Sequence, residues 1–206
     1  LDETTNLPKG FALRRPVWGE RSRPYFGSLT GKTIRVIGTS PLAEALRQAL
    51  KESGALDNDK PEMVVDLSSG VSVSFEVAKE LNDNPPKEWI AICHPAPGVL
   101  PSAASHGARA GHAKALGREW TSTSARVIQL GMGLSPEEAS ALICQELACP
   151  DGGQEITLTL HSRQVLELVV EPLPDAPQRP EKEVVLVTGG GRGITARLAI
   201  ELAKLK

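Results

Sequence analysis

The sequence is poor in aromatic residues, cysteine and methionine. Only 3% of its 206 residues are Phe, Trp or Tyr, and it has three Cys and two Met. The core must therefore be built mainly from Leu, Val, Ile and Ala. The cysteines, Cys93, Cys144 and Cys149, are odd in number and lack framework spacing, which predicts reduced thiols and a cytoplasmic protein. We interpret Cys144 and Cys149 as packing residues at a helix end.

Neither sign of charge dominates, and long hydrophobic runs are missing. Lys plus Arg number 23 and Asp plus Glu number 25, for a net charge of −2, so the chain has no basic footprint for nucleic acid. No apolar run approaches the ~20 residues that span a bilayer. The polar start LDETTNLPKG does not resemble a signal peptide. We expect no nucleic-acid partner and no membrane partner.

From residue 32 onward, short apolar stretches alternate with segments of helical length. The pattern predicts four strands, at 32–37, 63–67, 88–93 and 126–130. Helices are predicted after them, at 41–53, 75–81, 102–120 and 136–147. Two further strands, at 156–160 and 165–170, flank a turn at 161–163.

Two of these helices carry strong start signals. Ser40 stands at a cap position before Pro41, and Gly54 follows the end of the same helix. Ser135 and Pro136 open the last helix of the series, with carboxylates in its first turn. Alternating strands and helices predict an α/β fold, a Rossmann-like doubly wound and mostly parallel sheet with helices on both faces. We based this prediction on right-handed crossovers.

Two regions differ from this pattern. Residues 1–30 are predicted to be an N-terminal extension in which RRPVW forms an edge strand, because proline is tolerated at a sheet edge. Its arginines, which we expect on a solvated or interface surface, are Arg14, Arg15, Arg21 and Arg23. Residues 171–182 are rich in proline and are predicted to be a linker.

After the linker the chain carries a second strand–turn–helix signature. An apolar strand is predicted at 183–188, a glycine-rich turn follows, and a helix is predicted at 194–206. Glycines let a backbone approach a pyrophosphate, and the helix N-terminus favours its charge. The candidate cofactor-binding residues are Thr188, Gly189, Gly191, Arg192, Gly193 and Ile194. A tight turn with a purely structural role is the alternative.

The turn resembles the Thr-Gly-x-x-x-Gly-x-Gly motif of short-chain dehydrogenases/reductases. Thr188, Gly189 and Gly193 match the motif, whereas its last glycine is Thr195 here. The Gly-Ile-Thr variant is similar to ketoreductases of polyketide and polyunsaturated fatty-acid synthases. That resemblance implies NADPH as the cofactor, with Arg192 where NADPH-preferring members often carry a basic residue.

Residues 12–170 resemble the structural subdomain of the same ketoreductases, a reductase-like unit without catalysis, and we assign 31–170 to it. GARAGHAKALGREW is the most specific piece. Reductases of this family use Tyr-x-x-x-Lys, but the position four before Lys114 is Ala110. In the first turn Gly38 stands alone and Pro41 removes an N–H that a phosphate would use. We therefore expect this unit to be inactive.

The remaining candidates have ordinary structural interpretations. His94, His106, His112 and His161 lack metal-ligand spacing, so no metal site is predicted. Asp66 ends a predicted strand and is interpreted as a turn or cap residue. Lys114 is interpreted as solvent-facing or salt-bridged. No catalytic residue can be assigned in the chain.

The resemblance implies a fragment of a β-ketoacyl ketoreductase in a multidomain synthase. Residues 183–206 would be the first strand–turn–helix of the catalytic NADPH-binding subdomain, docked on the structural subdomain or on a second copy. The implied partners are the remaining catalytic subdomain, an acyl carrier protein bearing a β-ketoacyl thioester, and other synthase domains. The alternatives are a free-standing two-domain 3-oxoacyl reductase and a non-enzymatic, Rossmann-like interaction module.

Overall fold

The computed structural model describes residues 14–22, 27–94, 103–149, 153–170, 187–189 and 191–204. The chain divides into two compact units. One runs from Arg14 to Val170, and the other contains 1–13 and 171–206. Each unit is described by itself.

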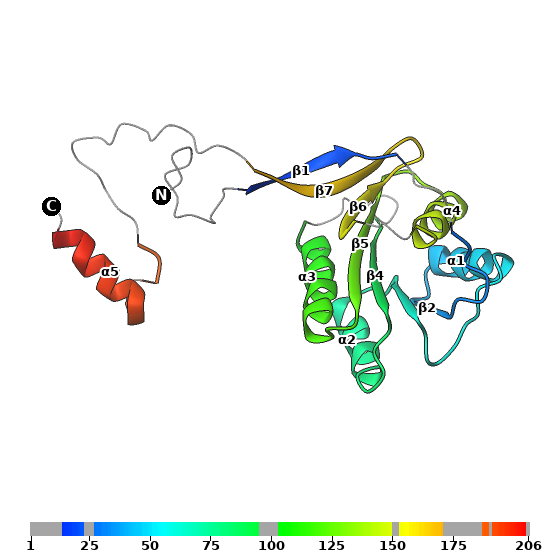
Figure 1. Cartoon of the computed structure of the whole chain (residues 1–206), viewed down its shortest axis with the longest axis horizontal. Helices are drawn as coiled ribbons and strands as arrows, with labels where there is room; N and C mark the ends of the chain where they lie inside the picture. The colour runs from blue at the N-terminus through cyan, green and yellow to red at the C-terminus, as the bar shows by residue number, and fades with distance from the viewer. Residues whose placement is uncertain are drawn as a thin grey trace. The chain divides into compact units, whose positions relative to one another are not determined.

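A seven-stranded sheet forms the centre of the larger unit (Figure 1). Its order is β1-β7-β6-β5-β4-β3-β2, with β2 to β6 parallel and β7 and β1 antiparallel to their neighbours. This confirms the α/β class and the mostly parallel sheet. The strands are β1 (Arg14–Glu20), β2 (Ile34–Ile37), β3 (Met63–Asp66), β4 (Glu88–Cys93), β5 (Ser124–Leu130), β6 (Glu155–Leu158) and β7 (Arg163–Val170).

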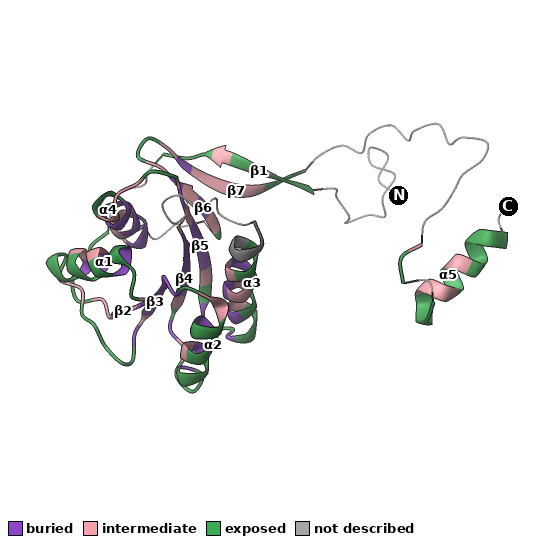
Figure 2. Cartoon of the chain, turned by 180° about the vertical axis from the view of Figure 1, so that it is seen from behind, coloured by how far each residue is buried: buried purple, intermediate pink, exposed green. Residues whose placement is uncertain are grey.

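Helices cover both faces of the sheet, as predicted. Residues of α1 (Pro41–Glu52) and α4 (Pro136–Leu147) share one buried apolar cluster, and α1 packs on α4. Residues of α2 (Val71–Glu80) and α3 (Ala103–Glu119) contribute to a second cluster on the opposite face. The strands between these layers are the most deeply buried part of the unit (Figure 2).

The way in which both faces become covered differs from the prediction. The parallel strands follow one another in a single direction across the sheet, from β2 to β6. Each pair of consecutive parallel strands is connected by one of the helices α1 to α4. Because α1 and α4 lie on one face and α2 and α3 on the other, the connections through α1 and α4 have the opposite hand to those through α2 and α3. The right-handed rule on which we based the doubly wound sheet therefore does not hold for one of the pairs. The order of the parallel strands, from β2 to β6, does not reverse within the sheet.

The two faces differ in composition. The buried residues of the α1/α4 cluster are aliphatic apart from Met63, in line with the predicted Leu, Val, Ile and Ala core, and Cys144 packs against them. The α2/α3 cluster contains Trp89 and Trp120, which are 0% and 7% exposed. Their ring centroids are 6.0 Å apart. These two buried tryptophans thus lie on the same face of the sheet.

Several boundaries differ from the predicted ones. Helix α2 begins at Val71, four residues before the predicted start, because Gly70 caps it without a side-chain hydrogen bond that a sequence pattern would reveal. Strand β2 is shorter than 32–37, since Thr33 forms only an isolated bridge with Leu56. Strand β6 ends at Leu158 because Thr159 turns the chain by bonding to Ser162.

In the smaller unit the structure describes one helix, α5 (Gly193–Lys204), close to the predicted 194–206. Of the predicted strand at 183–188, only Val187 and Thr188 are described, and neither lies in a strand. The predicted linker at 171–182 lies outside the described residues. In the described part of the chain, no helix is long and apolar enough to cross a membrane.

Candidate functional site

The predicted phosphate turn begins with Thr188 and leads into α5. Gly189 has φ 72° and Gly193 has φ 63°, both in the left-handed region that favours glycine. Cβ atoms built at Gly189, Gly191 and Gly193 would meet no described atom within 4 Å. The turn therefore has the backbone freedom that close approach to a phosphate requires.

The N-terminus of α5 also suits an anion. The first turn of this helix contains no acidic residue, and Arg192 precedes it directly. Ile194, in the first turn of α5, is 80% exposed. The partial positive charge of the helix end and the guanidinium of Arg192 have the same sign.

The corresponding turn of the larger unit, between β2 and α1, is closed. Gly38 has φ 119°, and a Cβ there would lie 2.5 Å from the carbonyl oxygen of Leu67. The Arg47 guanidinium donates hydrogen bonds to the carbonyls of Gly38 and Val36, at 2.5 Å and 3.0 Å. The glycine is needed for packing against the residue that follows the next strand, and the Arg47 guanidinium is already bonded to the backbone.

The N-terminus of α1 is also largely occupied. Pro41 has no N–H, the Ala43 N–H donates to Oγ of Ser40 at 3.2 Å, and the Glu44 N–H donates to the Ser40 carbonyl at 3.1 Å. Glu44 places a carboxylate in the first turn. The small number of free N–H donors and the negative charge of Glu44 are unfavourable for phosphate binding at this helix end. The predicted cap and the predicted loss of a donor at Pro41 are both present.

Two further positions that resemble reductase residues have internal partners. Lys114 pairs with Glu155, as the salt-bridged interpretation predicted, and Ala110 is buried in the α2/α3 cluster. Asp66 is 2% exposed, and its Oδ1 accepts the Ser68 N–H at 2.9 Å. This is the predicted turn role, and it uses an oxygen that a ribose would need.

Among the described histidines, His112 lies in a packing position. His112 Nδ1 lies 3.0 Å from Ser74 Oγ, and its ring contacts Trp89 edge-on. Burial lowers the pKa of His112, against the opposing charge of Asp66, and burial also lowers that of His94. His161 lies in the predicted turn, and the side chain of His106 lies outside the described residues.

Burial raises the pKa of the Cys93 and Cys144 thiols to about 11. All three cysteines are free, as predicted. In the described residues, no group of three or more His, Cys, Asp or Glu side chains could hold a metal ion.

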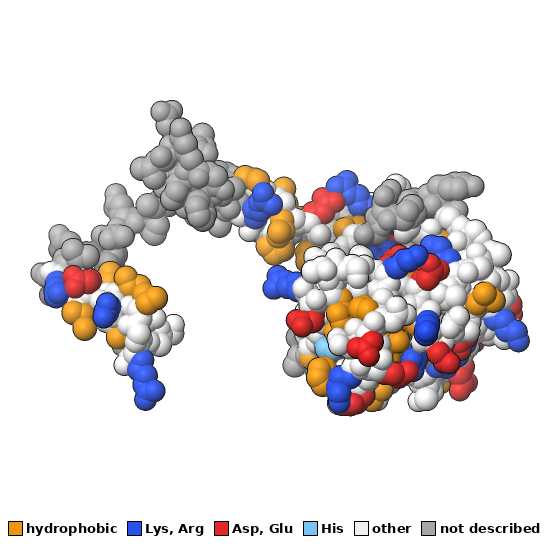
Figure 3. Space-filling model, turned by 60° about the horizontal axis from the view of Figure 1, so that its bottom comes forward, with side chains coloured by type: hydrophobic (Ala, Val, Ile, Leu, Met, Phe, Trp, Pro, Cys, Tyr) orange, Lys and Arg blue, Asp and Glu red, His pale blue; other side chains and the backbone are white. Residues whose placement is uncertain are grey.

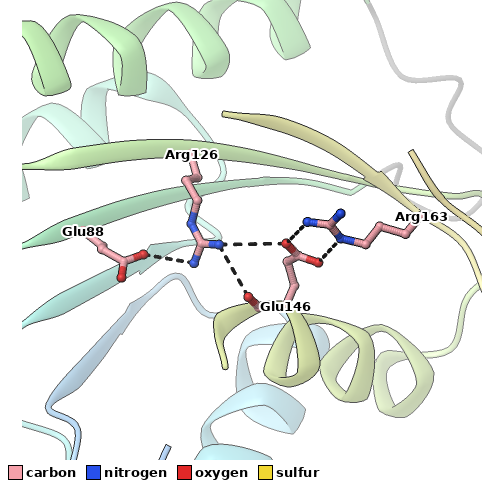
Figure 4. Close-up of polar contacts among 4 residues, drawn as sticks. All are labelled: Glu88, Arg126, Glu146 and Arg163. Atoms are coloured by element: carbon pink, nitrogen blue, oxygen red, sulfur yellow. Dashed lines mark hydrogen bonds and ion pairs between the residues drawn. The ribbon is translucent and has the colours of Figure 1, made fainter. Parts of the chain in front are cut away.

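A buried cluster of charged side chains was not predicted from the sequence (Figure 4). Glu146 of α4 accepts two hydrogen bonds from Arg163 of β7, at 2.7 Å and 2.9 Å. Arg126 of β5 lies 3.9 Å from Glu146 Oε1 and 3.0 Å from Glu88 Oε2. Arg126, Glu146 and Arg163 are each 5% exposed or less. The hydrogen bond to Glu146 raises the pKa of Arg163 above its ordinary value.

One cavity of about 450 Å³ lies between α3 and the beginning of β5. Lys114 and Arg118 contribute to its lining, but Lys114 already pairs with Glu155. This is the end of the parallel sheet where β5 starts, whereas nucleotides bind at the carboxyl ends of such strands. The cavity is therefore not the site that the reductase resemblance predicts.

No family model matches the sequence. Over 106 residues, the chain is 31% identical to a polyunsaturated fatty acid synthase protein from Thraustochytrium sp., a region that makes up 49% of this chain and 4% of that protein. Among solved structures, it matches an A-type ketoreductase from a modular polyketide synthase with TM-score 0.61 and 19% identity. It matches the first ketoreductase of the tylosin polyketide synthase with TM-score 0.63 and 19% identity.

This chain has the fold of polyketide-synthase ketoreductases. The matches cover 94% and 93% of it, and 50% and 49% of the two ketoreductases, so the chain spans about half of their length. Another match, with TM-score 0.57, is a multidomain structure that combines adenylation, ketoreductase and pseudo Asub domains. The ketoreductase-like fold, first inferred from residue motifs, is thereby confirmed.

Proposed function

We propose that the chain belongs to a cytoplasmic multidomain polyketide or fatty-acid synthase, in which it serves NADPH-dependent reduction of a β-ketoacyl thioester on an acyl carrier protein. Residues 31–170 act as the structural subdomain, and residues 183–206 open the catalytic subdomain. The observation that carries this proposal is the contrast between an open glycine turn before α5 and a closed one before α1.

In this proposal the cofactor residues are those of the second turn. The backbone from Gly189 to Gly193 would hold the pyrophosphate, Arg192 would face the 2′-phosphate, and Thr188 and Ile194 would shape the two ends of the turn. NADPH supplies the hydride when bound. The chain's own contribution is to bind and orient the cofactor, because no proton-donating residue is assigned in it.

The exposed side of α5 supports a larger surrounding subdomain. Ile194, Leu198 and Leu202 follow one another at helical spacing and are 80%, 56% and 46% exposed. A helix beside a parallel strand normally buries such a side against its sheet. The exposed apolar side therefore fits the first helix of a subdomain with more strands.

The larger unit contributes no reacting group in this proposal and serves as a scaffold. Its Lys114 is paired, its Asp66 is bonded to the backbone, and its α1 terminus is capped. Deleting residues 1–170 from the natural polypeptide should therefore abolish reduction by removing support. Retention of most of the activity would contradict the scaffold role.

The direct test is NADPH titration of the natural polypeptide that contains these residues and the subdomain following them. Gly189→Ala and Gly193→Ala should weaken binding about tenfold or more, because a side chain keeps the backbone from the phosphates. Gly133→Ala is the matched control, since Gly133 also has a positive φ, 81°, and open surroundings but lies elsewhere. Failure of the unaltered polypeptide to bind NADPH would instead favour the interaction module.

A further inference from the structure

The cavity between α3 and the beginning of β5 takes no part in the proposed function. All the described residues that line it belong to the larger unit, and its volume of about 450 Å³ lies in the range of pockets that hold small molecules. Strand β5 begins at Ser124, whereas β6 pairs with it only from Val127 onward. The first residues of β5 therefore border the cavity without a described strand beside them on that side.

The main chain of Ala125 carries an unused hydrogen-bond donor at this edge. The Ser124 N–H donates to the Lys87 carbonyl, before β4, at 2.8 Å. The Val127 N–H donates to the Gln154 carbonyl, before β6, also at 2.8 Å. Since N–H groups alternate between the two neighbouring strands, the Ala125 N–H faces the side of Gln154, and both residues line the cavity. Within the described ranges this N–H has no hydrogen-bond partner.

Two cationic side chains of α3 lie beside this donor. Lys114 and Arg118 are four residues apart, so they lie on the same side of the helix, and both line the cavity. Helix α3 comes close to β5 here, because a Cβ at Gly117 would lie only 2.8 Å from the Cβ of Ala125. The ammonium of Lys114 has three N–H donors and uses one of them on Glu155, which leaves two for a ligand.

Arg118 is the second cation at the cavity. It is exposed, and none of the described residues forms an ion pair or a hydrogen bond with its guanidinium. Arg126 also lines the cavity, but its guanidinium pairs with Glu88 and Glu146. Figure 3, in which the bottom of Figure 1 comes forward, shows cationic and acidic side chains mixed over the larger unit. The excess of positive charge that Arg118 creates is therefore local to the cavity.

We propose that this cavity binds a phosphate group, free or as the monoester of a small molecule, through Arg118, Lys114 and the Ala125 N–H. A guanidinium, an ammonium and a main-chain N–H form the strong, charge-assisted hydrogen bonds that phosphate oxygens accept. Ser124 and Gln154 also line the cavity, and they offer a hydroxyl and an amide to the rest of a phosphorylated molecule. The site shares no residue with the turn before α5, so it does not depend on the proposed function.

Amide NMR shifts of the 206-residue chain test the proposal in titrations with inorganic phosphate and with glycerol phosphate at constant ionic strength. The Ala125 amide should shift and saturate, because it donates directly to the anion. Tighter binding of inorganic phosphate would assign the site to the free ion, and tighter binding of glycerol phosphate to a phosphorylated molecule. An unchanged Ala125 amide would overturn the proposal, even if the amides from Gly189 to Gly193 shifted, which would instead support the turn before α5.

Matched variants separate phosphate binding from a purely local role of Arg118. This residue lies in the last turn of α3, where a cation also favours the negative end of the helix dipole, and Lys51 has the same place in α1. Arg118→Gln should weaken phosphate binding about tenfold or more, and Arg118→Lys should weaken it less. Lys51→Gln should leave the affinity within about twofold. Unchanged affinity in Arg118→Gln, or equal losses in Arg118→Gln and Lys51→Gln, would overturn the proposal.

Discussion

The turns before α1 and α5 both contain glycine but have very different surroundings. In the turn before α1, a glycine packs on the next strand, a serine caps the helix, a proline removes a donor and an arginine bonds the carbonyls. In the turn before α5, two glycines have left-handed backbone and no described atom blocks their Cβ positions. The comparison teaches that a glycine in the turn before a helix does not by itself indicate a phosphate site, because in the first turn packing and capping use the glycine and the donors.

The largest expected effect is on the stability of the larger unit, which contains the turn before α1. Glu146→Ala should destabilise the larger unit by about 3–5 kcal/mol, because it leaves Arg126 and Arg163 buried without their shared carboxylate. Urea unfolding measures the change. Glu76→Ala, which removes the exposed pair with Lys79, is the control and should change stability by less than about 0.5 kcal/mol. Similar losses in both variants would contradict the structural role of the cluster.

Gly38→Ala separates stability from nucleotide binding. The new methyl group would lie against the Leu67 carbonyl at a strained φ, so we expect a loss of about 1–3 kcal/mol in unfolding free energy. NADPH affinity of the natural polypeptide, measured well below the unfolding midpoint, should stay within about twofold. A selective loss of NADPH binding without destabilisation would show that the first turn, too, serves the cofactor.

Arg192→Gln examines the second turn. Removing a guanidinium that faces the 2′-phosphate should weaken NADPH binding about tenfold and leave NADH binding nearly unchanged. Parallel titrations with the two cofactors measure the preference. Arg197→Gln, within α5 and five residues after Arg192, provides a control that also removes a positive charge. An equal loss for both cofactors would assign Arg192 a general rather than a selective role.

The smallest expected effect is a pH dependence of the stability of the larger unit. Burial lowers the folded pKa of His112, so the unfolded chain takes up its proton first as the pH falls below about 6.5. Stability should therefore be full above this value and decrease below it, down to the folded pKa. His112→Gln should reduce the loss between pH 7.5 and pH 5.5 in urea unfolding. His94 contributes in the same direction, so His94→Gln measures its share.

Local patterns predicted most elements of the fold. Ser40 with Pro41 and Ser135 with Pro136 placed the starts of α1 and α4, and Ser135 forms a full capping box with Glu138. The start of α2 was wrong because Gly70 and the exposed Val73 give no cap and no apolar periodicity. Arg126 and Glu146 could have been noticed as charges within predicted apolar elements. Their partner Arg163, however, is known only from the way β7 returns beside β6.

The residues themselves determined the strands, the caps, the missing Tyr before Lys114 and the glycines of both turns, because each depends on side chains a few positions apart. Only the tertiary structure decided the hands of the crossovers, the closure of the Gly38 turn by Leu67, the buried ion cluster and the pairing of β1 with β7. All of these depend on which distant segments become neighbours. That choice is made by the packing of whole layers, which no local pattern contains.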